Sequence, residues 1–332
     1  MHPDVKIEKL SSVRSTQTLY FVGGLLGRET NRGWTLFPVS GDETQDVLLL
    51  GSWANFEAVV EELGLIYVGT EQRISSETDS PTIRFWEPGR RDTNGLNAAD
   101  AWAGVANSAK KAGDASYSNV ATYISACLRV AGLRLRGTSE GYHDQLRWAL
   151  RAQTAVGRGF SNVAVLDIYA DIHSLLSELA SARDHLARIA AVHVQAPEKI
   201  DCLAWLEKWV KTNKAAESEP LVAALLAASG TKESPGWLRR LSEFRNEVTH
   251  RIPLAANNRV SGLVLESQAT RLGPISTIRL GEIQGDGTAA SNLDPLTEVA
   301  ELSKKMEMHL RSASRLAKYQ PSFPTFVGSL GT

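Results

Sequence analysis

Several features that would narrow the class of this protein at once are missing from its sequence. Only two cysteines occur, Cys127 and Cys202, far apart in the chain. They predict neither a disulfide framework nor a cysteine-based zinc site, so a reducing compartment such as the cytoplasm is the simplest expectation. The N-terminus has no apolar signal segment, and no run of about 18 apolar residues occurs. We therefore expect a cytoplasmic protein without a membrane segment.

An excess of charge of one sign is also missing. The net charge is -1 at pH 7 over 332 residues, so we expect no overall attraction to nucleic acid or to an anionic membrane. Any binding of nucleic acid must therefore use a local basic patch. A dispersed series of arginines is a candidate for such a patch, although it also fits an ordinary solvated surface: Arg129, Arg134, Arg136, Arg147, Arg151 and Arg158.

The first part of the chain is rich in strand-forming segments. Short runs of β-branched and aromatic residues alternate with Gly, Asn, Asp and Ser clusters, which predicts strands and turns. One amphipathic helix is expected around Phe56 and Val60, ending at Gly64. The clustered glycines of "GGLLGRE" (23–29) match no phosphate-binding loop and predict a hairpin turn. Residues 1–95 are thus predicted to form a small α+β domain, to which the sequence assigns no role.

Beyond residue 95 the pattern becomes helical, and the predicted fold class is α+β with a β-rich N-terminal domain followed by an all-α helical bundle. Connecting helices are expected over 96–156, as separate helices at 118–135 and 139–155. The bundle is expected over 157–320, with a tail at 321–332. Within the bundle we predict a long helix at about 161–195, a β-hairpin or long loop at 253–290, and a later helix at about 235–252 that begins at Pro235.

The later helix carries the stretch "FRNEVTH", residues 244 to 250. At 100° per residue its apolar side chains fall on one arc, whereas Asn246 and His250 share the opposite, polar side with Arg239. Arg245 lies at the edge of the apolar arc. An imidazole can take a proton from a ribose 2′-hydroxyl, a guanidinium can hold a phosphate, and an amide can orient either group. The pattern therefore suits RNA cleavage without a metal ion.

The spacing of Arg and His alone is a weak signal. With 24 arginines and 7 histidines in the chain, about half a match to Arg-x4-His is expected by chance. A second match does occur at Arg188 and His193, inside an apolar run without a polar helper. Requiring Asn directly after the Arg lowers the chance expectation to about 0.02. The histidines of the long helix are too widely spaced to form a zinc site, so no metal is expected.

With these residues in view, "RNEVTH" resembles the Arg-[Asn/Asp/His]-x3-His motif of HEPN domains (higher eukaryotes and prokaryotes nucleotide-binding). The predicted helical bundle, with a long early helix and the motif on a late helix, is similar to the HEPN fold. "SARDHLARIA" is similar to a stretch that many such domains carry on the early helix, and on that match Asp184 would face the site and orient the Arg or the His. The resemblance covers roughly residues 140–320 and leaves residues 1–95 unexplained.

This resemblance implies a metal-independent endoribonuclease that acts as a homodimer, needs no cofactor and leaves a 2′,3′-cyclic phosphate on its RNA substrate. Many members of the family are toxins or phage-defence effectors, so an antitoxin or regulatory partner is a further expectation. Arg245, Asn246 and His250 carry over as catalytic residues and Asp184 as a supporting residue. Arg239 and Arg240 are candidates for RNA contacts.

Two alternatives stay open at this point. The first is a catalytically silent HEPN scaffold that binds a nucleotide or a partner protein. The second is a helical interaction protein in which the motif is a coincidence. The presence of Arg, Asn and His together favours the nuclease over the silent scaffold.

Overall fold

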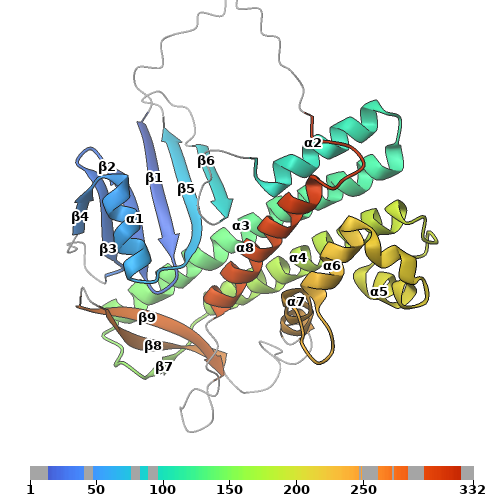
Figure 1. Ribbon diagram of the computed structural model, residues 1–332. Helices are drawn as coiled ribbons and strands as arrows, with labels where there is room; N and C mark the ends of the chain where they lie inside the picture. The colour runs from blue at the N-terminus through green and yellow to red at the C-terminus, as the bar shows by residue number, and fades with distance from the viewer. Residues whose placement is uncertain are drawn as a thin grey trace, which may run out of the picture.

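A computed structural model describes residues 14–40, 48–75, 83–88, 96–246, 248, 261–270, 273–282 and 295–322. An antiparallel sheet at the N-terminus is followed by helices and by a second, smaller sheet (Figure 1). This arrangement confirms the predicted α+β class with a β-rich first part. None of the helices within the described ranges has both the length and the apolar character needed to cross a bilayer.

The N-terminal sheet has the strand order β4-β3-β2-β1-β5-β6, with antiparallel neighbours throughout. Helix α1 (Trp53–Glu62) packs on one face through the buried Phe56 and Val60, as the sequence predicts. Gly64, just beyond it, has a positive φ of 62°, which suits a residue that ends a helix. The strands are β1 (Arg14–Phe21), β2 (Leu25–Thr30), β3 (Gly33–Pro38), β4 (Leu48–Gly51), β5 (Tyr67–Ser75) and β6 (Ile83–Pro88).

The predicted hairpin turn in "GGLLGRE" joins β1 to β2. Gly23 and Gly24 have φ angles of 89° and 73°, a region that side chains with a Cβ adopt at a cost. A Cβ on Gly24 would also lie 2.6 Å from the backbone oxygen of Ser276, in the second sheet. The glycines therefore serve both the turn and a close approach between the two sheets.

The helical part is built around two long helices that pack along one another, α3 and α4. The predicted long helix is present as α4, close to its expected bounds. The last helix, α8, lies across the bundle in Figure 1. The helices are α2 (Ala98–Lys111), α3 (Ala115–Arg151), α4 (Val165–His193), α5 (Leu203–Thr212), the short 3-10 helix η1 (Lys214–Ser218), α6 (Pro220–Ser229), α7 (Trp237–Asn246) and α8 (Pro295–Ser314).

The expectation of separate helices at 118–135 and 139–155 is wrong, because α3 runs unbroken for 37 residues. The glycines in its middle permit close packing instead of ending a helix. A Cβ on Gly137 would lie 2.1 Å from the carboxylate of Asp171, and a Cβ on Gly141 would lie 2.8 Å from the side chain of Ile168. Both neighbours belong to α4, so these glycines let the two long helices approach each other.

The second sheet contains the hairpin predicted within 253–290. Strands β8 (Ser261–Thr270) and β9 (Gly273–Glu282) pair antiparallel over their full length, and β7 (Gly159–Phe160) adds to β8. The backbone N–H of Gly157 also donates to the carbonyl oxygen of Leu265 (2.7 Å). The hairpin is thereby fixed to the turn between α3 and α4.

Buried side chains continue from the N-terminal sheet into the helices. Tyr20 and Leu26 belong to the same core cluster as Trp102 and Leu146 of the helical part. Leu19 and its neighbours on the other face of the sheet form a second cluster under α1. The domain boundaries predicted near residues 95 and 156 stay predictions, and side chains pack across the first of them.

Candidate functional site on helix α7

Helix α7 begins at Trp237, two residues later than the sequence predicts. The N–H groups of Arg239 and Arg240 both donate to the carbonyl oxygen of Gly236 (3.1 Å each). Gly236 itself donates to Ser229 at the end of α6 (2.8 Å), and a Cβ there would lie 2.2 Å from the carbonyl oxygen of Ala228. Pro235 therefore belongs to the tight turn after α6 rather than to the helix.

The two faces of α7 are those that the sequence predicts. Leu238, Leu241 and Phe244 are buried in the bundle. Arg245 and Asn246 are exposed on the last turn of the helix, and Nη1 of Arg245 lies 3.5 Å from Oδ1 of Asn246. That distance is at the limit of a hydrogen bond, so both side chains keep donors and acceptors for other groups. His250, the third predicted catalytic residue, lies outside the described residues.

On one side, α7 is held by an arginine of α4 that no motif in the sequence marks. The side chain of Arg183 is only 13% exposed, and its Nη1 donates to the hydroxyl of Ser242 on α7. Ser242 lies one turn before Arg245 and Asn246. Arg183 had no distinguishing signal in the sequence, because an arginine on an amphipathic helix is usually solvated.

Asp184, the predicted supporting residue, takes part in the same network. It accepts two hydrogen bonds from Arg183, at Oδ1 (3.0 Å) and Oδ2 (3.1 Å). Its Oδ1 also accepts from the N–H of Leu203, which holds the first turn of α5 (3.1 Å). Asp184 therefore reaches the motif helix through Arg183 and Ser242. Its predicted role in orienting Arg245 or His250 stays a prediction.

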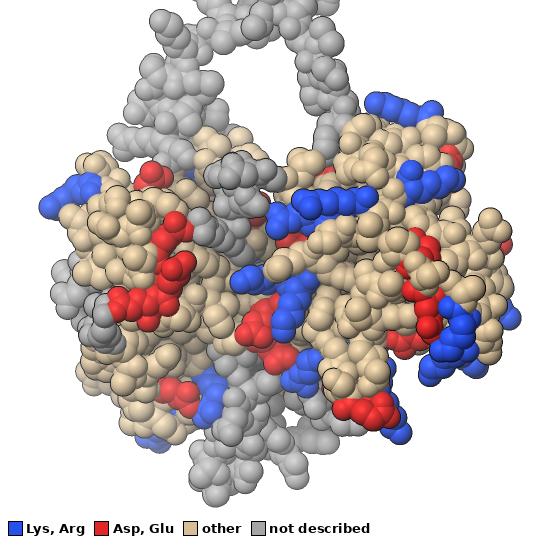
Figure 2. Space-filling model, in the orientation of Figure 1, with Lys and Arg blue, Asp and Glu red and all other residues tan. Residues whose placement is uncertain are grey.

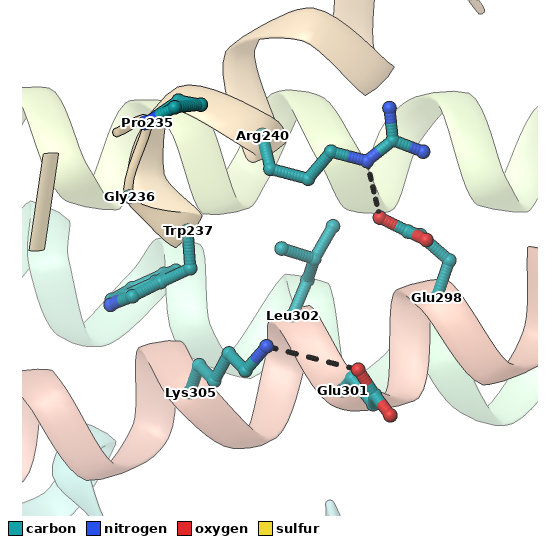
Figure 3. Close-up of a pocket in the computed structure, with 8 residues that line it drawn as sticks. All are labelled: Pro235, Gly236, Trp237, Arg240, Glu298, Glu301, Leu302 and Lys305. Atoms are coloured by element: carbon teal, nitrogen blue, oxygen red, sulfur yellow. Dashed lines mark hydrogen bonds and ion pairs between the residues drawn. The ribbon is translucent and has the colours of Figure 1, made fainter. Parts of the chain in front are cut away.

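On the other side, α7 faces α8 across a pocket of about 250 Å³. Nε of Arg240 donates to Glu298 (2.8 Å), and Lys305 lies 3.7 Å from Glu301 (Figure 3). Each cation of the pocket thus faces a carboxylate, an arrangement that gives the pocket no net attraction for a polyanion. The pocket is lined by Pro235, Gly236, Trp237, Arg240, Glu298, Glu301, Leu302 and Lys305.

The two predicted RNA-contacting arginines differ in their surroundings. The guanidinium of Arg240 is paired with Glu298 and also lies over the ring of Phe244, 5.4 Å from its centroid. Arg239 is half-buried and belongs to the polar side of the helix, with Glu243 and Asn246. Between the contacts to α4 and those to α8, this polar side is the part of α7 that faces away from the bundle core.

The dispersed arginines of α3 do not form one continuous basic stripe. Arg129 pairs with Asp100 (2.6 Å), and Arg134 pairs with Asp171 (3.0 Å). In the middle of Figure 2, basic and acidic side chains lie next to one another. No group of three or more metal-ligating side chains is found in the part of the chain that the structure describes.

In the second Arg-x4-His match, both ring nitrogens of His193 lie within hydrogen-bonding distance of side chains in the bundle. Nδ1 of His193 lies 2.9 Å from Oε1 of Glu219, and its Nε2 lies 3.1 Å from the hydroxyl of Tyr117. Glu219 also accepts from the N–H of Val222 and so caps α6 (2.8 Å). This histidine joins the ends of α3, α4 and α6, in keeping with its location in an apolar run.

Comparison of the chain with protein-family models, with curated proteins and with solved structures found no match. The similarity to HEPN domains therefore rests on the motif residues and on their position in the sequence.

Proposed function

We propose that this protein is a metal-independent endoribonuclease of the HEPN type, with Arg245, Asn246 and His250 as its catalytic residues. One observation carries the proposal. Arg245 and Asn246 stand next to each other, exposed, at the end of a helix whose flanks are fixed by α4 and α8. A helix held in this way presents its polar groups to a substrate in a defined geometry, which favours catalysis.

Each residue has a chemical role in this reaction. The neutral imidazole of His250 accepts the proton of a ribose 2′-hydroxyl, whose oxygen attacks the adjacent phosphorus. Arg245 donates hydrogen bonds to the phosphate oxygens, where negative charge develops. Asn246 orients the phosphate or the imidazole. The bond from phosphorus to the 5′-oxygen breaks, and that oxygen takes up a proton, leaving a 2′,3′-cyclic phosphate and a 5′-hydroxyl.

The proposed enzyme acts as a homodimer in which two copies of α7 face each other. Two-fold pairing places two sets of Arg, Asn and His around one groove. One imidazole can then accept the proton of the attacking hydroxyl while the other supplies a proton to the leaving oxygen. A cytoplasmic role as a toxin or phage-defence effector, controlled by an antitoxin or regulatory partner, is supported by the family resemblance alone.

The test is incubation of the purified protein with total RNA in EDTA. We expect His250→Ala and Arg245→Ala to lower the cleavage rate by at least about 100-fold, the lower end of what general acid–base catalysis contributes. The matched controls are His173→Ala, at an exposed histidine of α4, and Arg315→Ala, at an exposed arginine just after α8. Both controls should cleave like the wild type. RNA binding without cleavage in the wild type would favour a silent scaffold.

The dimeric arrangement has its own test. Mixing Arg245→Ala with His250→Ala should restore part of the activity if each groove uses residues from both copies. A protein that is monomeric at every concentration at which it cleaves RNA would contradict this arrangement.

A further inference from the structure

The end of α3, the turn after it and the start of α4 carry several exposed apolar side chains that the proposed catalytic residues do not use. Trp148 is 45% exposed at the end of α3, and Val156, Val163 and Leu166 are 62%, 83% and 46% exposed. Single exposed apolar residues are normal on soluble proteins, whereas several within one short segment indicate an interaction surface.

The same segment is locally basic. Between Gln145 and Leu166 the chain contains Arg147, Arg151 and Arg158 and no Asp or Glu. Arg147 pairs with Asp144, just before the segment (2.6 Å). The side chains of Arg151 and Arg158 are exposed. Because the whole chain has almost no net charge, a local patch of this kind is what binding of a polyanion requires.

The exposed tryptophan is held in a fixed position. Its ring stacks on Phe160, with centroids 5.3 Å apart and an interplanar angle of 28°. Phe160 pairs with Leu263 in the second sheet, and Nδ2 of Asn162 donates to Oε1 of Gln145 on α3 (2.6 Å). The aromatic pair is therefore supported from α3 on one side and from the β8–β9 hairpin on the other.

We propose that this stacking surface, made of Trp148, Phe160, Arg151 and Arg158, binds single-stranded RNA. An unpaired base stacks on the exposed face of Trp148, and the two arginines contact flanking phosphates, as in proteins that bind single strands without reading sequence. A duplex hides the faces of its bases, so the surface favours single strands. The identification of RNA rather than DNA rests on the proposed nuclease function.

The test is fluorescence anisotropy with a short, labelled single-stranded RNA in EDTA, with His250→Ala present in every protein to prevent cleavage. We expect Trp148→Ala to weaken binding about tenfold. Trp148→Phe should retain most of the affinity, because the phenylalanine ring that replaces the indole can still stack on a base. Arg158→Ala should weaken binding and reduce the slope of log K against log salt by about 0.7, the value for one phosphate contact on a single strand. Trp205→Ala, at a 50% exposed tryptophan of α5, and Arg315→Ala are the matched controls.

Several outcomes would overturn the proposal. Equal binding by the Trp148→Ala and Trp205→Ala proteins would remove the stacking role, and equal affinity for duplex RNA would contradict the preference for single strands. If Trp148→Ala abolished self-association in sedimentation and left RNA affinity unchanged, a second copy of the chain would be the occupant. If binding depends on Trp148 but the wild-type protein, assayed separately, cleaves no RNA, the nuclease proposal fails and this inference stands.

Discussion

At the scale of single residues, the structure contains a buried histidine whose burial no sequence pattern predicts. His143 of α3 is 1% exposed, and its Nδ1 lies 2.6 Å from the carbonyl oxygen of Ser139. Burial lowers its pKa from 6.5 to about 4, because the charged imidazolium loses its hydration. The folded protein therefore holds this side chain neutral at physiological pH.

A defined pH dependence of stability follows. Between pH 6.5 and about 4 the unfolded chain binds a proton at His143 that the folded protein does not, so the free energy of unfolding falls as the pH is lowered. The loss reaches roughly 3 kcal/mol near pH 4. His143→Gln, which has no titrating group, should show a weaker decrease over this range in urea unfolding. An unchanged decrease would contradict the prediction. Burial also lowers the pKa values of His185 and His309. These two histidines therefore still lower the free energy of unfolding of the His143→Gln protein as the pH falls.

The sequence predicts the environments of some of these residues and not of others. The exposure of Asn246 follows from helical periodicity, because the position along a helix decides which side chains face the core. Periodicity places Arg245 only at the edge of the apolar arc, and the structure shows it exposed. Helical periodicity does not predict the hydrogen-bonded environment of Arg183 or the burial of His143. Their environments depend on partners from other elements, and periodicity carries no information about those partners.

At the scale of elements, the contact between α4 and α7 decides how the motif helix is held. Arg183→Ala removes the donor to Ser242 and the two hydrogen bonds that Asp184 accepts from Arg183, so that Asp184 keeps the bond from the N–H of Leu203. We expect a loss of about 2 kcal/mol in the free energy of unfolding, since charge-assisted hydrogen bonds of a largely buried group are broken. Arg315→Ala, at an exposed position, should change it by less than about 0.5 kcal/mol. Urea unfolding of both variants measures the difference, and equal values would contradict the assigned role of Arg183.

Elements whose ends are marked by local chemistry were easier to predict than elements defined by packing. Helix α6 begins at Pro220 and is followed by Gly230, with a φ of 68°, and such signals are visible in the sequence. Over α3 the sequence pattern predicts two helices, at 118–135 and 139–155, yet the helix is continuous and its glycines fit against α4. The start of α7 was missed for a similar reason, because Gly236 packs on the end of α6.

At the scale of the whole molecule, the N-terminal sheet and the helices are joined by charge as well as by the core. Glu71, which is 1% exposed, is paired with Arg84 of β6, and Arg84 also pairs with Glu140 of α3. Burial by itself would raise the pKa of Glu71, but the hydrogen bonds from Arg84 and Arg73 lower it below its usual value. The carboxylate therefore stays charged and links the sheet to the longest helix.

We expect the sheet and the helices to unfold in a single transition. Far-ultraviolet circular dichroism, which follows the helices, and tryptophan fluorescence, which includes Trp34 and Trp86 of the sheet, should give coincident urea curves. Two separated transitions would show instead that residues 1–95 fold independently, as the predicted domain boundary implies.

The proposed chemistry itself is tested most directly by the products formed from one RNA and from the DNA of the same sequence, both in EDTA. The 2′-hydroxyl mechanism predicts that the protein cleaves the RNA alone and leaves a 2′,3′-cyclic phosphate, and that His250→Ala and Arg245→Ala do neither while His173→Ala does both. Cleavage of the DNA, or cleavage by His250→Ala as fast as by the wild type, would contradict it.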